Sequence, residues 1–247
     1  RSLLTALEVH GSDGLGGVTR IVEPDGARRY PEPRAGLDPR PGVDLILDTI
    51  ARYPDEVTLI ATGPLTNVAR AIIRNPARMR RLREVLVMGG AFRTYGNVTP
   101  VAEFNLYVDP HAAQLVLDFG LPVTLVPLDV TEQVRLMRAD VASLAERGRL
   151  ARFVRDATRE YMDFHVGHDG FDGCYLHDPI TVALALDPAL LGGGDAFVQV
   201  ETAGDVALGQ TVADLRPGKS ARTNARVCTE IDAERFLALF RERVMLG

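Results

Sequence analysis

The chain has 247 residues, of which 46% are apolar and 25% charged, and its formal net charge is −5. This length fits one large α/β domain over residues 1–247, and the mild charge without a Lys/Arg stripe argues against a nucleic-acid partner. No apolar run is long enough for a transmembrane helix. Because Cys174 and Cys228 lack CxxC or zinc-finger spacing, we expect no disulfide framework and a cytoplasmic protein without membrane contact.

The first half of the chain alternates strand and helix patterns. Residues 23–42 hold five of the fifteen prolines and indicate an ordered surface loop. Three β-branched runs, at residues 57–61, 85–88 and 123–126, predict short buried strands. Residues 64–74 and 111–119 have the apolar spacing of helices, the second after Asp109-Pro110, an N-cap followed by proline. The order implies an α/β fold with a mostly parallel central sheet flanked by helices.

The second half of the chain has a different texture. Residues 139–147 and 150–165 predict helices, and a glycine-rich loop at 167–173 leads to a further helix at 177–186. Residues 197–202 and 206–212 predict a β-hairpin, and residues 232–244 a closing helix. His165 and His168 are expected to be exposed. A metal role for them is disfavoured, since no carboxylate stands at helical spacing upstream.

Polar side chains follow the second predicted strand. The run 85–91 ends in small residues, and Asn97, Glu103 and Asn105 come shortly after it. A buried parallel strand that leads into a flexible loop with amides and a carboxylate is the usual place for a small-molecule site. Glu103 and Asn105 alternate with apolar residues, so both could face one side of an extended segment. The local sequence slightly favours the alternative, a polar loop with asparagines at turns.

Asp178 precedes Pro179 at the start of the helix at 177–186. The chain has two other Asp-Pro pairs, at 109–110 and 187–188, so an N-cap and a functional role are about equally supported by the local sequence. His177 and the glycine-rich loop before it favour the functional role. A His-Asp pair supplies a titratable group beside a hard oxygen ligand.

Two further segments carry weaker signals. Residues 9–17 include four glycines together with His10 and Asp13, but they match neither GxGxxG nor a P-loop, which excludes a dinucleotide or P-loop site there. Residues 61–67 form a strand-to-helix turn with Thr66 in the first helical turn. This turn is either a plain helix start or a source of a carbonyl or hydroxyl at the carboxyl edge of the sheet.

In their order and spacing, these segments resemble the inosine–uridine-preferring nucleoside hydrolases. The matching pieces span nearly three quarters of the chain. They are Val9-His10-Gly11 with the glycine-rich turn to residue 17, the TGPLTN run at 62–67, the VMGG run at 87–90, Gly96-Asn97, the AEFN run at 102–105, Asp109-Pro110 and the HDP run at 177–179.

The resemblance implies the nucleoside hydrolase fold, a Ca²⁺ ion at the carboxyl edge of the sheet, and cleavage of the N-glycosidic bond of ribonucleosides by a dimer or tetramer. It also implies site residues. Asp178 would bind calcium through its carboxylate and Thr62 through its main-chain oxygen. The ribose hydroxyls would be held by Asn97, Glu103 and Asn105, and the sugar pocket would be lined by Met88.

The resemblance implies contacts with the nucleobase as well. His177 would lie near the base and could protonate a leaving purine, and His10 would border the base pocket. Tyr161 and His165 are on the helix that in the family often closes over the base.

The chain departs from the family pattern at one motif. The family begins with a strand that ends in an aspartate cluster of the form DxDxxxDD, which gives most calcium ligands and the general base, and this sequence contains no such cluster. The N-terminal strand or strands of the sheet would be missing with it. An incomplete sequence record, a missing fragment and a degenerate relative remain open, and the first two are favoured because a truncated sheet would expose an apolar edge.

Two other functions compete with nucleoside hydrolysis. The first is that of a catalytically inactive nucleoside- or ribose-binding protein of the same fold. The second is that of a non-catalytic assembly subunit, which would bind neither calcium nor ribose.

Overall fold

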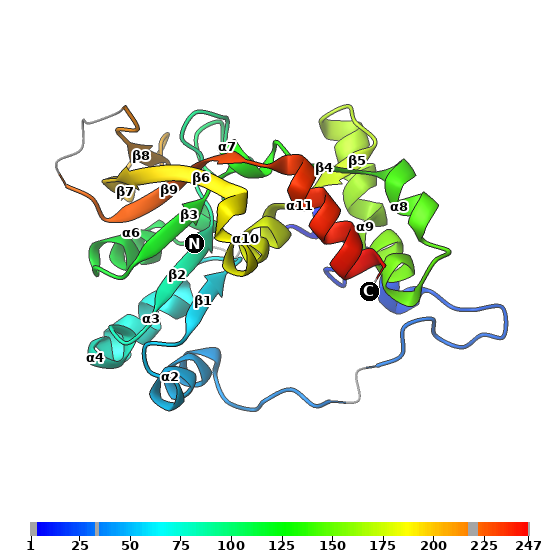
Figure 1. The fold of residues 1–247 in the computed structure, drawn as a ribbon, viewed down its shortest axis with the longest axis horizontal. Helices are drawn as coiled ribbons and strands as arrows, with labels where there is room; N and C mark the ends of the chain where they lie inside the picture. Colours follow the sequence, from blue (N-terminus) through cyan, green and yellow to red (C-terminus); the bar gives the residue numbers. More distant parts are fainter. Residues whose placement is uncertain (1–3, 33–34, 217–221, 247) are drawn as a thin grey trace. The chain divides into compact units, whose positions relative to one another are not determined.

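The computed structural model describes residues 4–32, 35–216 and 222–246 (Figure 1). The chain divides into two compact units. Unit 1 comprises Arg1–Asp38, Val134–Leu176 and Ala233–Gly247, and unit 2 comprises Pro39–Gln133 and His177–Asp232. The single domain over residues 1–247 stays a prediction.

Unit 2 contains a five-stranded sheet. Its strand order is β1 (Thr58–Ala61), β2 (Glu84–Met88), β3 (Val123–Val126), β9 (Ala225–Ile231) and β6 (Leu191–Ala196). The first four strands are parallel, and β6 is antiparallel to β9. The predicted mostly parallel sheet is therefore confirmed, with β1, β2 and β3 within one residue of the predicted bounds.

Helices cover both faces of this sheet. Val85 and Val87 of β2 belong to a core cluster with side chains from α2 (Gly42–Arg52), α3 (Thr66–Arg74) and α6 (Pro110–Asp118). Leu86 and Met88 alternate with them and are equally buried, and α10 (His177–Leu186) packs against β1 and β2. Residues 85–88 of β2 therefore have an apolar layer on either face, as a central strand of a parallel sheet requires.

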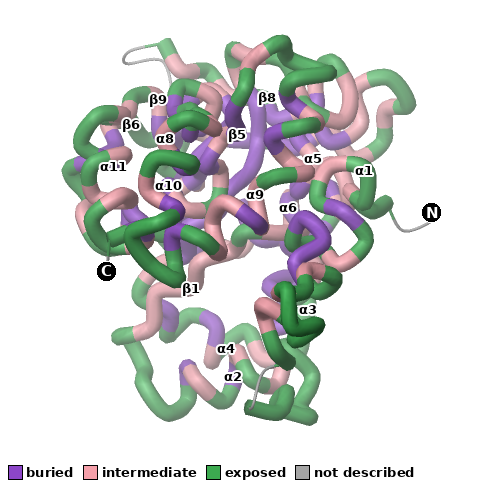
Figure 2. Tube along the Cα trace, turned by 90° about the vertical axis from the view of Figure 1, so that its right-hand side faces the viewer, coloured by how far each residue is buried: buried purple, intermediate pink, exposed green. Residues whose placement is uncertain are grey.

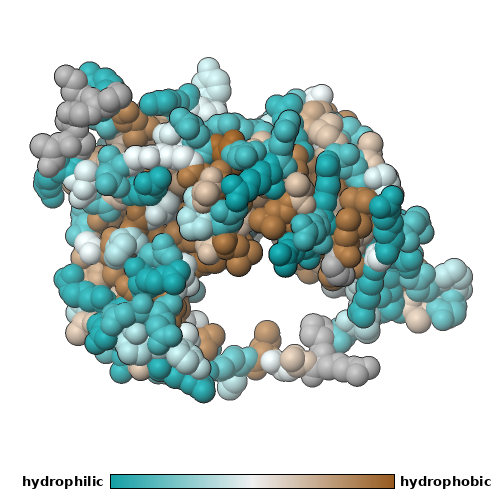
Figure 3. Space-filling model, viewed as in Figure 1, coloured by the Kyte–Doolittle hydropathy of each residue, from teal (hydrophilic) through white to brown (hydrophobic). Residues whose placement is uncertain are grey.

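The helices of unit 2 bury one side and expose the other. In Figure 2 buried positions alternate with exposed ones along them, and in Figure 3 hydrophilic side chains cover the region of α2, α3 and α4 (Pro76–Met79). The same one-sided pattern in the sequence had predicted α3 and α6. The helices α3, α6 and α10 are confirmed, α10 with the predicted bounds.

Short elements complete unit 2. They are α5 (Phe104–Val108), α7 (Leu128–Thr131), the 3-10 helix η2 (Pro188–Leu190), β7 (Val198–Val200) and β8 (Thr211–Ala213). β7 and β8 pair antiparallel, which confirms the predicted pairing. The second strand begins five residues later than predicted, because residues 203–210 form the turn.

Unit 1 is built around the long helix α9 (Arg149–His168). It also contains α1 (Leu7–His10), η1 (Val18–Arg20), the antiparallel pair β4 (Arg135–Met137) and β5 (Gly173–Tyr175), α8 (Arg138–Leu144), α11 (Ala233–Phe240) and a π-helical turn, η3 (Arg241–Met245). The predicted helices at 139–147, 150–165 and 232–244 are confirmed with shifted ends. α9 ends at His168, three residues later than predicted, so its last two residues lie in the predicted glycine-rich loop.

Other expectations concern the chain as a whole. No helix of the described ranges is long and apolar enough to cross a membrane. Cys174 and Cys228 are both buried and free. The predicted surface loop at residues 23–42 consists of turns and extended backbone up to α2 at residue 42, and its positions 33 and 34 lie outside the described residues.

Candidate active site

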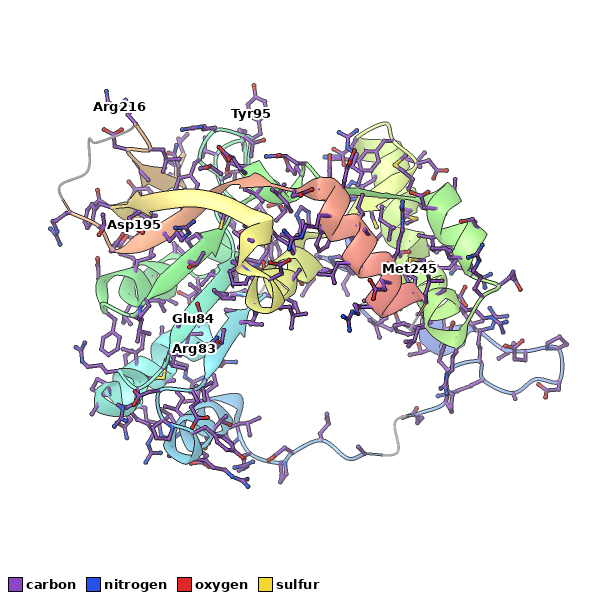
Figure 4. The ribbon with its side chains drawn as sticks, in the orientation of Figure 1. Arg83, Glu84, Tyr95, Asp195, Arg216 and Met245 are labelled. Atoms are coloured by element: carbon purple, nitrogen blue, oxygen red, sulfur yellow. The ribbon has the colours of Figure 1, made fainter. Side chains whose placement is uncertain are left out.

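The parallel strands bring several predicted site residues to one edge of the sheet. The register pairs Ala61 of β1 with Val87 of β2, and Met88 of β2 with Val126 of β3, so the three strands end side by side. Thr62 follows β1 at this edge. Glu84, at the start of β2, marks the opposite edge (Figure 4).

The loop after β2 is held through its backbone. The N–H of Gly90 donates to Glu103 Oε2 (3.1 Å), and the N–H of Ala91 donates to Thr211 Oγ1 (2.9 Å). Gly90 has φ +93°, a conformation that favours glycine, and an added Cβ would stand 3.3 Å from the Thr211 side chain. The sequence indicated a flexible loop, whereas the structure anchors it at successive residues.

A further anchor comes from the segment after β3. The carboxylate of Asp129 accepts hydrogen bonds from the N–H groups of Phe92 (2.8 Å) and Arg93 (2.7 Å). Beyond them Tyr95, 81% exposed, points away from the ribbon (Figure 4). The loop therefore has a fixed base and an exposed tip.

Glu103 is a buried carboxylate that caps a helix. It is 1% exposed, and besides the Gly90 N–H it accepts hydrogen bonds from the N–H groups of Asn105 (2.7 Å) and Leu106 (3.1 Å) in the first turn of α5. Burial raises the pKa of Glu103 to about 7, although these three hydrogen bonds oppose the shift. The extended segment predicted for Glu103 and Asn105 is wrong, because Asn105 lies inside α5.

The two asparagines present opposite polar groups. Asn105 is buried and donates from Nδ2 to the main-chain oxygen (3.1 Å) and sulfur (3.4 Å) of Met88, which leaves its Oδ1 as an acceptor. Asn97 is exposed, and its Oδ1 accepts a hydrogen bond from the Phe104 N–H (2.8 Å), which leaves its Nδ2 as a donor. Together the pair offers one acceptor and one donor, and a sugar hydroxyl can bind to either.

Asp178 does not cap its helix. Asp109 accepts a hydrogen bond from Ala112 N–H (3.0 Å) and Asp187 from Ala189 N–H (3.2 Å), as N-caps do. α10 begins one residue before Asp178, and no hydrogen bond to its carboxylate is found in the described part of the chain. Desolvation by the surrounding protein raises the pKa of Asp178 to about 6, although solvent still reaches the side chain.

His177 is tied to a residue that the sequence analysis missed. Its Nδ1 lies 2.6 Å from the hydroxyl oxygen of Thr131, at the end of α7. Thr131 follows β3 at the same edge of the sheet as Thr62 and the Gly89-Gly90 turn, and this position was the one available signal. Nothing in the local sequence distinguishes it from other threonines.

Unit 1 holds the remaining predicted residues as a ring cluster. Tyr161 lies between His10 and His165, with ring centroids 5.0 and 4.5 Å away. The predicted exposure of His165 is wrong: it is 4% exposed, its Nδ1 bonds to Asp169, and its buried Nε2 has no partner within the described residues. His165 stands one turn after Tyr161 and so shares its buried face. His168 is exposed as predicted.

The carboxylate in the glycine-rich turn of unit 1 is structural. Asp13 accepts hydrogen bonds from the N–H groups of Leu15, Gly17 and Thr19 and from the Thr19 hydroxyl. These hydrogen bonds hold the pKa of Asp13 well below the usual range, and the one from the Thr19 N–H has the largest effect. Its role is to shape the turn that follows His10.

The residues present fit part of a cation site. Asp178 offers a carboxylate to which no other described residue donates a hydrogen bond, and Thr62 offers a main-chain oxygen after β1. Both are hard oxygen donors of the kind that Ca²⁺ prefers. No group of three or more His, Cys, Asp or Glu side chains that could hold a metal ion occurs within the described ranges. The donor chemistry therefore fits, while the two donors fill only part of a coordination sphere.

A hollow of about 560 Å³ lies at the other edge of the sheet in unit 2. Its lining includes Glu84, Asp195, Asn224 and Arg226, near the amino ends of β2 and β9. Asn224 is occupied by hydrogen bonds to the main chain of Val198 (2.7 and 2.9 Å). None of the predicted site residues belongs to it, so it is separate from the candidate site.

Comparisons with known proteins agree on one family. A sequence model described as "Inosine-uridine preferring nucleoside hydrolase" matches residues 1–238. The chain is 36% identical over 246 residues to the pyrimidine-specific ribonucleoside hydrolase RihA of Enterobacter sp. (strain 638), covering 99% of the chain and 75% of that protein. An uncharacterized protein of Schizosaccharomyces pombe, C1683.06c, is 35% identical over 99% of the chain and 76% of its own length.

Solved structures give the same result. A plant nucleoside hydrolase, PpNRh1, superposes with a TM-score of 0.87 at 29% identity, covering 100% of this chain and 76% of that one. A purine-preferring ribonucleoside hydrolase from Gardnerella vaginalis has a TM-score of 0.85 at 30% identity, covering 97% and 73%. The chain thus spans about three quarters of the length of the relatives it matches.

Proposed function

The chain belongs to the inosine-uridine preferring nucleoside hydrolases, and we propose that it hydrolyses the N-glycosidic bond of ribonucleosides to give ribose and the free base. The observation that supports this most is the polar edge of the sheet in unit 2. There Glu103 binds the Gly90 N–H and Asn105 binds Met88 just before the Gly89-Gly90 turn, while Asn97 binds the N–H of Phe104 beside Glu103.

The sugar is held by groups of both polarities. The Asn105 Oδ1 accepts from one ribose hydroxyl, and the Asn97 Nδ2 donates to another. Met88 fixes the Asn105 amide through its main-chain oxygen and sulfur and lines the sugar pocket. Glu103, tied to three N–H groups, fixes the loop and places Asn105 for the sugar.

The reaction requires stabilisation of charge at two places. Cleavage of the C1′–N bond gives the ribose oxocarbenium character, which the carboxylates and amide oxygens near the sugar stabilise, as in glycosidases. The base takes the bonding electron pair, and His177 of unit 2 provides a donor for that charge. Within unit 1, the ring cluster of His10, Tyr161 and His165 presents aromatic faces of its own.

The family is generally metal-dependent, and we propose Ca²⁺ as the ion. Asp178 and the Thr62 main-chain oxygen would hold it together with further oxygen donors. When bound, such an ion orients a water molecule and the ribose hydroxyls. Asp178 suits this role because its carboxylate is partly desolvated and accepts no hydrogen bond from the residues that the structure describes.

The cellular setting follows from the same proposal. Free buried cysteines agree with a reducing compartment, and we propose that the protein acts in the cytoplasm. Release of free bases from ribonucleosides would serve purine or pyrimidine salvage there. We also propose a homodimer or homotetramer, as the family resemblance implies.

Product analysis tests the proposal. Uridine and inosine are incubated with the protein in phosphate-free buffer, and the products are separated by chromatography. Hydrolysis gives ribose and free base in equal amounts, and added phosphate leaves the products unchanged. Binding of nucleoside without release of base would instead favour a nucleoside-binding protein of the same fold.

A further inference from the structure

A buried hydroxyl holds one ring nitrogen of His177. The Thr131 Oγ1 lies 2.6 Å from Nδ1 of His177, 46 residues away in the chain. Thr131 is 0% exposed. The contact is therefore a short hydrogen bond whose threonine end is fully buried, while His177 is half-buried.

The fold fixes the position of this hydroxyl. α7, which ends at Thr131, packs against β3, β9 and α10. The N–H of Leu128 donates to the Gly90 main-chain oxygen (2.9 Å), and the N–H of Thr131 donates to that of Pro127 (3.1 Å). The helix that carries Thr131 is thus tied to the same Gly89-Gly90 turn that Glu103 holds.

The direction of the hydrogen bond follows from the partners available. Within the part of the chain that the structure describes, His177 Nδ1 is the one hydrogen-bond partner of the Thr131 hydroxyl. If the hydroxyl accepted from Nδ1–H, its own hydrogen would be buried without an acceptor, which is unfavourable. When it donates to Nδ1 instead, the hydrogen of the neutral imidazole is on Nε2.

We propose that Thr131 is the positioning residue of His177, holding the ring in the tautomer and orientation in which Nε2–H donates to the departing base. The inference rests on the proposed function. As the C1′–N bond breaks, its electron pair goes to the base nitrogen. The Nε2–H of His177 then donates a hydrogen bond to the negative charge that accumulates on the base.

A comparison of leaving groups tests this role. Uracil and hypoxanthine depart poorly without a donor, whereas p-nitrophenolate departs well unaided. In Thr131→Val, which replaces the hydroxyl by a methyl group, we expect kcat for uridine or inosine to fall about tenfold or more, since positioned donors contribute roughly 10²–10⁴-fold. The kcat for p-nitrophenyl β-D-ribofuranoside should change less than about twofold.

Two control variants separate position from packing. Thr131→Ser keeps the hydroxyl and should retain most of the uridine activity. Thr181→Val removes a hydroxyl that is equally buried, in α10, and without a hydrogen-bond partner within the described residues, so neither substrate should be affected. In a His177→Ala background, Thr131→Val should cause no further loss on uridine.

Different results would contradict the role of Thr131 and the proposed function. Equal losses on both substrates, or no loss on uridine, overturn the role of Thr131. A wild-type protein that releases ribose from neither substrate contradicts the proposed function. In that case the tautomer of His177 alone tests the role of Thr131. Nitrogen-15 NMR of the five histidines should show His177 with its hydrogen on Nε2, and a hydrogen on Nδ1 in the neutral ring would overturn it.

Discussion

Asp178 lies close enough to Glu103 for its negative charge to add to the larger effect of burial, which raises the pKa of the Glu103 carboxyl to about 7. Desolvation raises the pKa of Asp178 itself to about 6. Two neighbouring carboxyls thus both resist ionisation in the protein without a cation. A bound cation relieves this cost, so pH and metal should act on the same pair.

The first prediction concerns stability without metal. Both carboxyls have folded-state pKa values above their ordinary values of 4.5 and 3.8. Their contribution to stability is therefore fully present below about pH 4 and is lost as pH rises through about 6 and 7. In chelator, Asp178→Asn should reduce this loss, as seen in urea unfolding between pH 4 and 8. Identical pH dependence in the variant and the wild type would contradict the pairing.

The second prediction distinguishes a cap from a ligand. Asp187 and Asp178 both precede a proline, but only Asp187 accepts an N-cap hydrogen bond. Asp187→Ala should cost about 0.5–2 kcal/mol of unfolding free energy. Asp178→Ala in chelator at pH 8 should cost nothing and should abolish Ca²⁺ binding measured by calorimetry. Unchanged calcium affinity in Asp178→Ala would defeat the ligand assignment, and the Asp187 variant is its matched control.

The third prediction concerns Glu103 as a structural anchor. Glu103→Ala leaves three N–H groups without their acceptor, two of them in the first turn of α5. The expected loss is about 3 kcal/mol or more, at roughly 1–3 kcal/mol for each buried donor. Denaturant unfolding measures it. Asn97→Ala, at an exposed position, should cost about 1 kcal/mol or less, and a Glu103 variant of near wild-type stability would show that the anchor is dispensable.

The fourth prediction concerns the ribose hydroxyls. Asn105 offers an acceptor and Asn97 a donor, so deoxyribonucleosides should be poorer substrates than ribonucleosides. Asn97→Ala should lower kcat/KM for uridine by about three- to tenfold, the value of one neutral hydrogen bond. Wild-type protein should prefer uridine to both 2′-deoxyuridine and 3′-deoxyuridine. Asn97→Ala should reduce one of these two preferences more than the other, because the amide binds only one hydroxyl. Equal effects on uridine and on both deoxynucleosides would place the amide away from the sugar.

The sequence predicted what depends on local patterns. β3 and α10 have the expected bounds because a β-branched run, and an apolar run with an Asp-Pro pair in its first turn, are local signals. β6 was missed because Gly192, Gly193 and Gly194 favour a turn, and pairing with β9 overrides that preference. Local patterns also indicated the loop after β2 and the His177-Asp178 pair, whereas the roles of these residues came from the family resemblance.

The geometry of the site depends on contacts between distant residues. α5 begins at a glutamate, a residue that rarely caps helices, and it does so because Glu103 is also bonded to Gly90 on another segment. The partner of His177 comes from α7, and the burial of His165 reflects its place on the inner face of α9. Nothing in local sequence encodes these pairings.

The kcat/KM for uridine and inosine, measured by release of free base with calcium, with a chelator, and after calcium is restored, tests the central claim most directly. We predict ribose and base from at least one nucleoside in calcium, loss of activity in chelator, and recovery on adding the ion back. No release of base in calcium from a protein that still binds nucleoside would contradict the account.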